Sequence, residues 1–414
     1  MKDTTYKLEE SGDFVIENYS KAKAFSSFFP GIAGFGGVPL WAFYVNRGQC
    51  ISSFGIKNKD GAILEFLPAN QAYNLTAVKG FRTFIRIKKA GKALLYEPFK
   101  EYADKPAKDV STKMSIRPSD FEISEVNNAF GLEIRVAYVT VPGEPFAALA
   151  RRLSIRNISN RAMEMEIIDG LPQITPFGMT EWHSKHMSRT IEAWMQVLNM
   201  DKNAPFYKLK VNPQDTPELE YIERGNFYLA YIESGKKNKL LRPIVDPDLV
   251  FGPDGDLSYP RIFAESGNFN IPQKQKKEGK TPSAFSYARV NIKPANSKEI
   301  ISIMGHVKDL KSLNLLLPRV SRKGYFSAKL NEGRKVIDAL SNSAFTKSSS
   351  ANFDFYCRST FLDNLLRGGF PVTINIAAQK TVFYAYARKH GDLERDYNAF
   401  LLEPSYYSQG NGAY

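Results

Sequence analysis

The sequence predicts a mainly β fold, an antiparallel β-sandwich, followed by a helical region. Apolar and polar residues alternate in many short segments of the first 170 residues. Gly, Pro, Asn or Asp separates these segments, and no long helical pattern lies between them, as is typical of sandwiches. Aromatic residues make up 13% of the chain, with 29 Phe and 21 Tyr, which favours sheets over an all-helical fold.

The expected strands follow one another closely along the chain. They cover residues 14–19, 40–45, 50–56, 62–66, 83–87, 93–96, 113–116, 121–126, 132–141, 147–157 and 163–169, and then 206–211, 227–232, 285–292 and 300–306. An Asp-Gly turn at Asp60 predicts a hairpin between 50–56 and 62–66. Residues 246–260 are rich in Pro, Gly and Asp, so we expect a long loop there.

Helical patterns are concentrated in the last quarter of the chain. Residues 308–318, 333–343 and 353–366 are expected to be helices, the last ending at a Gly-Gly capping signal, and 381–388 can continue the helical structure. An isolated helix is expected at 180–198, with inward positions at Trp182, His186, Ile191, Trp194 and Leu198. The predicted organisation is a β-sandwich over 1–318, a helical linker over 319–351 and the beginning of a second domain over 352–414.

Charge and cysteine content exclude several classes of protein. The net charge is +13, but Lys and Arg are spread along the chain, and the run at 274–280 is expected to be a solvated loop, so no nucleic-acid partner is predicted. A positive field still favours an anionic ligand such as phosphate. Two distant cysteines, Cys50 and Cys357, fit a reducing cytoplasm. We find no signal peptide and no apolar run of about 18 residues, so no membrane partner is expected.

Two motifs, a histidine pair and a Gly-rich run, could suggest a ligand site, but neither has the sequence context that such a site needs. His183 and His186, at i and i+3, could share a metal, but no third ligand accompanies them and no metal is expected. The Gly-rich run at 31–37 leads into a strand, whereas a phosphate-binding loop leads into a helix. A tight turn is therefore the favoured interpretation of this run, with a ligand-facing loop as the alternative.

One aromatic run and several longer blocks indicate carbohydrate chemistry. Residues 41–49 mix aromatic rings with Asn46, Arg47 and Gln49, and sugars bind to rings and planar polar groups, although a core strand followed by a turn is the favoured interpretation of the run taken alone. The blocks are NRGQ at 46–49, SFGIKNKD at 53–60, EFLPAN at 65–70, LDNLLRGGFP at 362–371 and YSQGNGAY at 407–414. Together they resemble large bacterial glycoside phosphorylases of the cellobiose-phosphorylase-like clan, glycoside hydrolase family 94 and the β-glucan phosphorylase families 149 and 161.

The resemblance implies a galactose-mutarotase-like β-sandwich, a helical linker and the start of an (α/α)6 catalytic barrel. It also implies an inverting enzyme that cleaves β-glucan oligosaccharides with inorganic phosphate and releases α-glucose 1-phosphate. One carboxylic acid protonates the leaving oxygen, and phosphate takes the place of the water that an inverting glycosidase uses. No cofactor is implied, because phosphate is a co-substrate, and a cytoplasmic homodimer is expected.

The resemblance assigns substrate contacts to Gln409, Asn411 and Tyr414, and more weakly to Arg47 and Gln49. It assigns no catalytic residue, because the general acid is expected beyond Tyr414, as part of a longer enzyme. The charged residues Asp392, Glu394, Arg395 and Asp396 are better explained as a solvated helix end. The alternative function is a non-catalytic carbohydrate-binding or assembly module, and a hydrolase of the same architecture is a third possibility.

Overall fold

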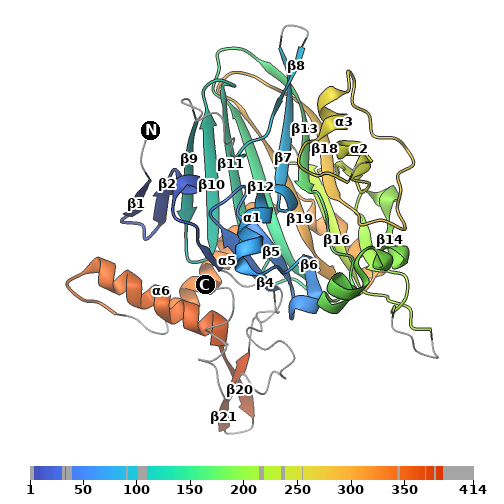
Figure 1. Cartoon of the computed structure of the whole chain (residues 1–414). Helices are drawn as coiled ribbons and strands as arrows, with labels where there is room; N and C mark the ends of the chain where they lie inside the picture. The colour runs from blue at the N-terminus through green and yellow to red at the C-terminus, as the bar shows by residue number, and fades with distance from the viewer. Residues whose placement is uncertain are drawn as a thin grey trace.

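A computed structural model of the chain describes residues 4–29, 33, 40–89, 92–100, 110–213, 219–234, 238–253, 255–342, 346–368, 370–376 and 379–385. Two large sheets face each other, and helices cover parts of their outer faces (Figure 1). In the described part of the chain, one sheet has ten strands, in the order β1 (Thr5–Leu8), β2 (Phe14–Glu17), β9 (Val110–Ile116), β10 (Asp120–Asn127), β11 (Leu132–Thr140), β12 (Ala147–Asn157), β19 (Ser297–Val307), β16 (Gly225–Ile232), β15 (Phe206–Leu209) and β14 (Met195–Leu198).

The second large sheet, of five strands, and a smaller sheet of four strands complete the sandwich. The five-stranded sheet has the order β17 (Arg242–Ile244), β18 (Ala284–Ile292), β13 (Met163–Leu171), β7 (Arg82–Lys89) and β8 (Lys92–Tyr96). The four-stranded sheet has the order β3 (Ser26–Phe28), β4 (Leu40–Val45), β5 (Ile51–Ile56) and β6 (Ala62–Leu64). The main core lies between the sheets, because residues of all three belong to one buried apolar cluster, among them Phe54, Ile85 and Val136.

Helices pack on the outer faces of both large sheets. The short helices α2 (Asp248–Phe251) and α3 (Arg261–Glu265) cover the five-stranded sheet through Phe251 and Phe263. Helices α4 (Leu310–Val320) and α5 (Tyr325–Ser341) cover one end of the ten-stranded sheet through a second core that includes Leu313, Val320 and Phe326. All of α5 lies in the segment predicted as a helical linker, and it buries its apolar side against the sandwich.

The strand predictions are confirmed with small shifts at their ends. Strands such as β10 and β12 follow from the alternation of buried and partly exposed residues, whereas β4 is buried throughout and follows from its dense apolar run. The hairpin at Asp60 is confirmed by the antiparallel pairing of β5 and β6. Helix α1 (Ala69–Lys79) is not predicted by its sequence pattern, because its apolar residues are weakly periodic. The expected loop at 246–260 is wrong in part, since α2 forms there and buries Val250 and Phe251.

Two predicted helices are corrected by the structure. Residues 180–198 form a π-helical turn over His183–Met187, a 3-10 stretch over Ser188–Trp194 and then strand β14. Strand β14 forms because Met195 and Val197 alternate with their neighbours and bury one side at the sheet edge. In place of a helix beginning at residue 381, β20 (Phe370–Ile376) pairs with β21 (Gln379–Ala385) as an antiparallel hairpin.

The predicted helix at 353–366 is confirmed as α6 (Ala351–Gly368). It extends away from the two sheets, with the β20–β21 hairpin beyond its end (Figure 1). Its first half is tied to the sandwich by the ion pair between Arg358 and Asp338 of α5. An (α/α)6 barrel beginning at residue 352 stays a prediction.

Candidate functional site

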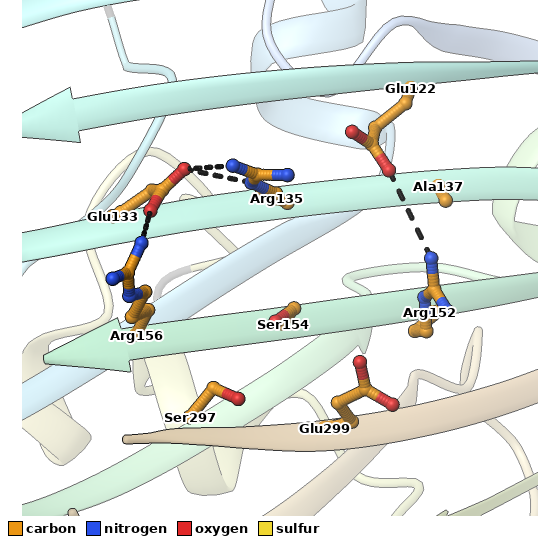
Figure 2. A pocket seen from close by; sticks show the side chains of 9 residues that line it. All are labelled: Glu122, Glu133, Arg135, Ala137, Arg152, Ser154, Arg156, Ser297 and Glu299. Carbon is orange, nitrogen blue, oxygen red and sulfur yellow. Dashed lines mark hydrogen bonds and ion pairs between the residues drawn. The ribbon is translucent and has the colours of Figure 1, made fainter. Parts of the chain in front are cut away.

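An open trough lies on the outer face of the ten-stranded sheet, on the part that α4 and α5 leave uncovered. It has a volume of about 280 Å³. Its lining comes from four neighbouring strands, β10, β11, β12 and β19, and consists of Glu122, Glu133, Arg135, Ala137, Arg152, Ser154, Arg156, Ser297 and Glu299 (Figure 2).

Strand register explains why these side chains meet. Glu133 pairs with Arg156 across β11 and β12, and Arg156 pairs with Ser297 across β12 and β19, so the three form one row. In the next row Arg135, Ser154 and Glu299 lie opposite one another. Because alternate residues of a strand point to the same face, both rows project into the trough. Small side chains at Ala137, Ser154 and Ser297 leave the space open.

The charges of the trough balance one another, with three carboxylates and three guanidinium groups. Glu133 lies between two arginines, at 2.5 Å from Arg135 Nη2 and 3.3 Å from Arg156 Nη1 (Figure 2). Arg152 Nη2 lies 4.0 Å from Glu122 Oε2. Glu299 has no hydrogen bond or ion pair to the other lining side chains (Figure 2). The trough thus offers a free carboxylate beside two hydroxyl groups, which suits a ligand with hydroxyl donors.

Gln49, one of the predicted substrate contacts, lies in the core between the sheets. Its Nε2 donates to Thr83 Oγ1 at 3.0 Å, and its Oε1 accepts from Arg151 Nη2 at 2.5 Å. Arg151 also donates to Asp169 Oδ2 at 2.5 Å, and both of these charged side chains are buried. Gln49 therefore holds a buried polar network together, and a substrate contact would require this network to open.

Arg47, the other described candidate, points in a different direction. Its Nη1 donates to Asn74 Oδ1 at 3.3 Å, and its guanidinium lies 5.4 Å from the centre of the Tyr73 ring. Both partners are on α1, so Arg47 fastens this helix to the β4–β5 turn. Between the two candidates, Gly48 has φ +55, and a β-carbon added there would lie 3.2 Å from the Ala77 α-carbon, so α1 would have to move slightly to accept a side chain. The structure does not bring Arg47 and Gln49 together.

The histidines have structural environments. The nearby Thr180 backbone N–H donates to His183 Nδ1 at 3.1 Å, while His186 is exposed. Among the described residues, no group of three or more potential metal ligands occurs. Burial, with the positive charges of Arg224 and Lys57, lowers the pKa of His306 to about 3, so this imidazole is neutral at pH 7.

The remaining predicted contacts, Gln409, Asn411 and Tyr414, lie outside the described residues, as do Asp392, Glu394, Arg395 and Asp396. The Gly-rich run is also outside, apart from the buried Ala33. In the part of the chain that the structure describes, no helix has the length and apolar character needed to cross a membrane.

The trough residues were not singled out in the sequence, although a signal was present. In the strands at 132–141 and 147–157, Glu133, Arg135, Arg152, Ser154 and Arg156 occupy alternate positions and so share a face. What the sequence could not indicate was that β12 would pair with β19, which brings Ser297 and Glu299 beside them.

No protein-family model matches the chain, and no curated protein matches its sequence. Solved structures with some likeness include a bacterial glucoamylase in complex with acarbose, at 9% identity and a TM-score of 0.37, covering 86% of this chain and 46% of the other. A candidate kojibiose phosphorylase from the human microbiome has 9% identity and a TM-score of 0.31, covering 90% and 40%.

A galactose mutarotase-like protein from Clostridium acetobutylicum has 10% identity and a TM-score of 0.33, covering 74% of this chain and 98% of the other. The chain spans less than half the length of the glucoamylase and of the candidate phosphorylase. At these scores the likenesses assign neither a family nor an activity to this chain.

Proposed function

We propose that this chain supplies the β-sandwich part of an inverting glycoside phosphorylase that acts on β-glucan oligosaccharides with inorganic phosphate. The observation that carries the proposal is that three of the resembling blocks, which lie close together within residues 46–70, form one continuous unit with strands β5 and β6. Residues 46–49 are the β4–β5 turn, 53–60 run from β5 into its hairpin loop, and 65–70 lead from β6 into α1. The residues of these three blocks therefore belong to one local structure, and this common location is what supports the proposal.

In the proposed reaction, a carboxylic acid protonates the glycosidic oxygen while a phosphate oxygen attacks the anomeric carbon from the opposite face. The bond from that carbon to the glycosidic oxygen breaks, a bond to phosphate forms, and the configuration inverts to give α-glucose 1-phosphate. Phosphate carries its own negative charge, so the protein needs no general base. We assign the acid to a position beyond Tyr414 and the donor-sugar contacts to Gln409, Asn411 and Tyr414. A homodimer belongs to the same proposal.

The proposal is tested first on the coding sequence. If it is correct, the reading frame continues past the codon for Tyr414 into the Arg-Asp pair that follows the Gly-Asn-Gly segment in the resembling enzymes, and further on it encodes the catalytic carboxylic acid. The encoded protein then forms α-glucose 1-phosphate from a β-1,2-, β-1,3- or β-1,4-glucan and phosphate. The 414-residue chain alone is expected to form no α-glucose 1-phosphate. If it did form the product, the assignment of the catalytic acid to a position beyond Tyr414 would be wrong.

A second candidate function, a carbohydrate-binding or assembly module, is favoured by the trough and its free carboxylate at Glu299. In this case the 414-residue chain binds a glucan equally well with and without phosphate, and the reading frame encodes no catalytic acid. Substitution Glu299→Gln is expected to weaken the binding, because a carboxylate accepts stronger hydrogen bonds than an amide does. Unchanged binding by that variant would remove the trough from consideration.

A further inference from the structure

An exposed tryptophan lies beside the unit formed by the resembling blocks. Trp182 is 57% exposed, and it belongs to the segment that precedes and enters the π-helical turn at His183–Met187. A single exposed apolar side chain needs no explanation in itself. Trp182 differs from the usual case because the backbone around it and the ring itself are held by a set of specific contacts.

The segment is fastened to the β5–β6 hairpin loop. The Glu181 backbone N–H donates to Asp60 Oδ1 at 2.9 Å, and the Glu181 carboxylate forms an ion pair with Lys59. The same carboxylate lies 2.7 Å from Lys185 Nζ. π-Helical turns are rare and occur often at functional sites. These contacts fix the backbone that carries Trp182, and they pair the nearby charges with one another.

The indole ring is also fixed in orientation. It stacks on the His186 ring with 4.8 Å between centroids and 19° between planes, and it meets His183 edge-on at 5.7 Å. His186 Nδ1 lies 2.9 Å from the Trp182 carbonyl oxygen, which can only accept, so Nδ1 carries the proton. In the neutral imidazole, Nε2 is then a hydrogen-bond acceptor. His186 covers one indole face and His183 meets the ring edge-on, and Trp182 is 57% exposed, so we infer that the opposite face is open to solvent.

We propose that the open face of Trp182 is a stacking platform for a glucose unit of a β-linked glucan, with His186 Nε2 accepting a hydrogen bond from a sugar hydroxyl. A β-linked glucose ring has its substituents equatorial, so each face presents axial C–H groups that fit a flat aromatic surface. Paired charges around the platform favour a neutral sugar over an anionic ligand. The inference rests on the proposed carbohydrate function and adds a binding site that lies on the sandwich.

The test uses the 414-residue chain with linear β-1,3- and β-1,4-gluco-oligosaccharides. Binding is measured by calorimetry, and the protection of tryptophan fluorescence from acrylamide is measured in parallel. Trp182→Ala is expected to weaken binding about tenfold or more and to abolish the protection. Trp194→Phe is the matched control, because Trp194 packs against a small apolar cluster, and it should bind like the unchanged chain. His186→Phe keeps the stacking but lacks the Nε2 acceptor, so an intermediate loss is expected.

The outcomes separate the platform from the wider proposal. If Trp182→Ala binds glucans as tightly as the unchanged chain while keeping the same thermal unfolding, the platform is wrong and the carbohydrate function stands. If the platform were instead a protein contact, the substitution would change the sedimentation of the chain and leave sugar binding unaltered, which also overturns the inference. If the unchanged chain binds no glucan at millimolar concentration, the platform fails, while the reading-frame test still decides the proposed phosphorylase.

Discussion

Arg151 and Arg152 are neighbours in β12 whose side chains lie on opposite faces of the ten-stranded sheet. Arg151 is buried between the sheets, where it donates to Asp169 and Gln49. Arg152 faces the trough, where its nearest carboxylate oxygen, on Glu122, is 4.0 Å away. A buried charge is tolerated only when it is paired and hydrogen-bonded, whereas an exposed ion pair contributes little. The two residues have the same chemistry and opposite importance for stability.

Substitution Arg151→Met is therefore expected to lower the free energy of unfolding by about 3–5 kcal/mol, because it leaves Asp169 buried without its partner. Arg152→Met, its matched control, should lower it by no more than about 1 kcal/mol. Urea unfolding of the two variants measures both values. Equal losses would mean that the buried network does not contribute in the way the geometry indicates.

Helices α4 and α5 show how an element outside the sheets becomes part of the sandwich. Phe326 of α5 is 1% exposed and belongs to the core beneath these helices, whereas Leu315 of α4 is 72% exposed. Asp120 of β10 binds Arg334 of α5, with its Oδ2 at 3.0 Å from Nε and its Oδ1 at 3.1 Å from Nη2. Apolar burial and a two-point ion pair thus hold α5 on the sheet.

We expect Phe326→Ala to lower the free energy of unfolding by about 3–5 kcal/mol, because it removes a large side chain from a filled core. Leu315→Ala should change it by less than about 0.5 kcal/mol, since that side chain is in solvent. Denaturant unfolding with both variants compares them directly. A small loss for Phe326→Ala would indicate that α5 is only loosely attached.

The Asp120 contact predicts a dependence on pH. Burial alone would raise the pKa of Asp120, but hydrogen bonding and charge from Arg334, with help from Ser119 and Arg117, outweigh burial and lower it below its usual 3.8. A carboxyl whose pKa is lowered by folding stabilises the native state above that usual value, and the stabilisation is lost as the pH falls through the folded pKa. Asp120→Asn should therefore cost about 2 kcal/mol near neutral pH.

The difference between Asp120→Asn and the unchanged chain should shrink as the pH is lowered from about 5 towards about 2. Unfolding free energies measured across that range test the sign. Glu122→Gln, on the same strand, should cost less than about 1 kcal/mol throughout, because its ion pair is long and partly exposed. If the difference in unfolding free energy between Asp120→Asn and the unchanged chain grew as the pH fell, Asp120 would not have the lowered pKa described above.

At the scale of the whole molecule, the central strands have both faces buried. In β11, Ile134 and Val136 belong to the core between the sheets, while Ala137 and Val139 belong to the core beneath α4 and α5. Both cores are built on the same strands, so unfolding of the core between the sheets would also disrupt the core beneath α4 and α5, and the reverse holds as well. We therefore treat the sandwich and these two helices as a single folding unit.

This unit is expected to unfold in one transition. Tryptophan fluorescence and far-UV circular dichroism should give coincident melting curves, and Arg151→Met and Phe326→Ala should both shift that same transition to lower temperature. The two substitutions lie in different cores, so a shift of the same transition by both would show that the two cores unfold together. A separate early transition that responds to Phe326→Ala alone would show that the helices unfold independently of the sandwich.

The sequence by itself determined most of the strands of the two large sheets. Alternation along 147–157 predicted β12, and the Asp-Gly turn at Asp60 predicted the β5–β6 hairpin, because strand periodicity and turn chemistry are local properties. It also placed α6 through its helical spacing. The burial of Gln49 was not predicted, because a polar side chain in a strand turn carries no local sign of the buried partners it will meet.

Tertiary structure decided what local patterns leave open. It paired β12 with β19, about 150 positions later, and so assembled the trough. It also turned the helix expected at 180–198 into π- and 3-10-helical turns that end at Trp194 and an edge strand over Met195–Leu198, and it left Trp182 exposed. It also put Asp120 against Arg334, 214 residues apart. Such contacts depend on which distant surfaces can bury apolar area together, and burial is a property of the assembled sheets rather than of any one segment.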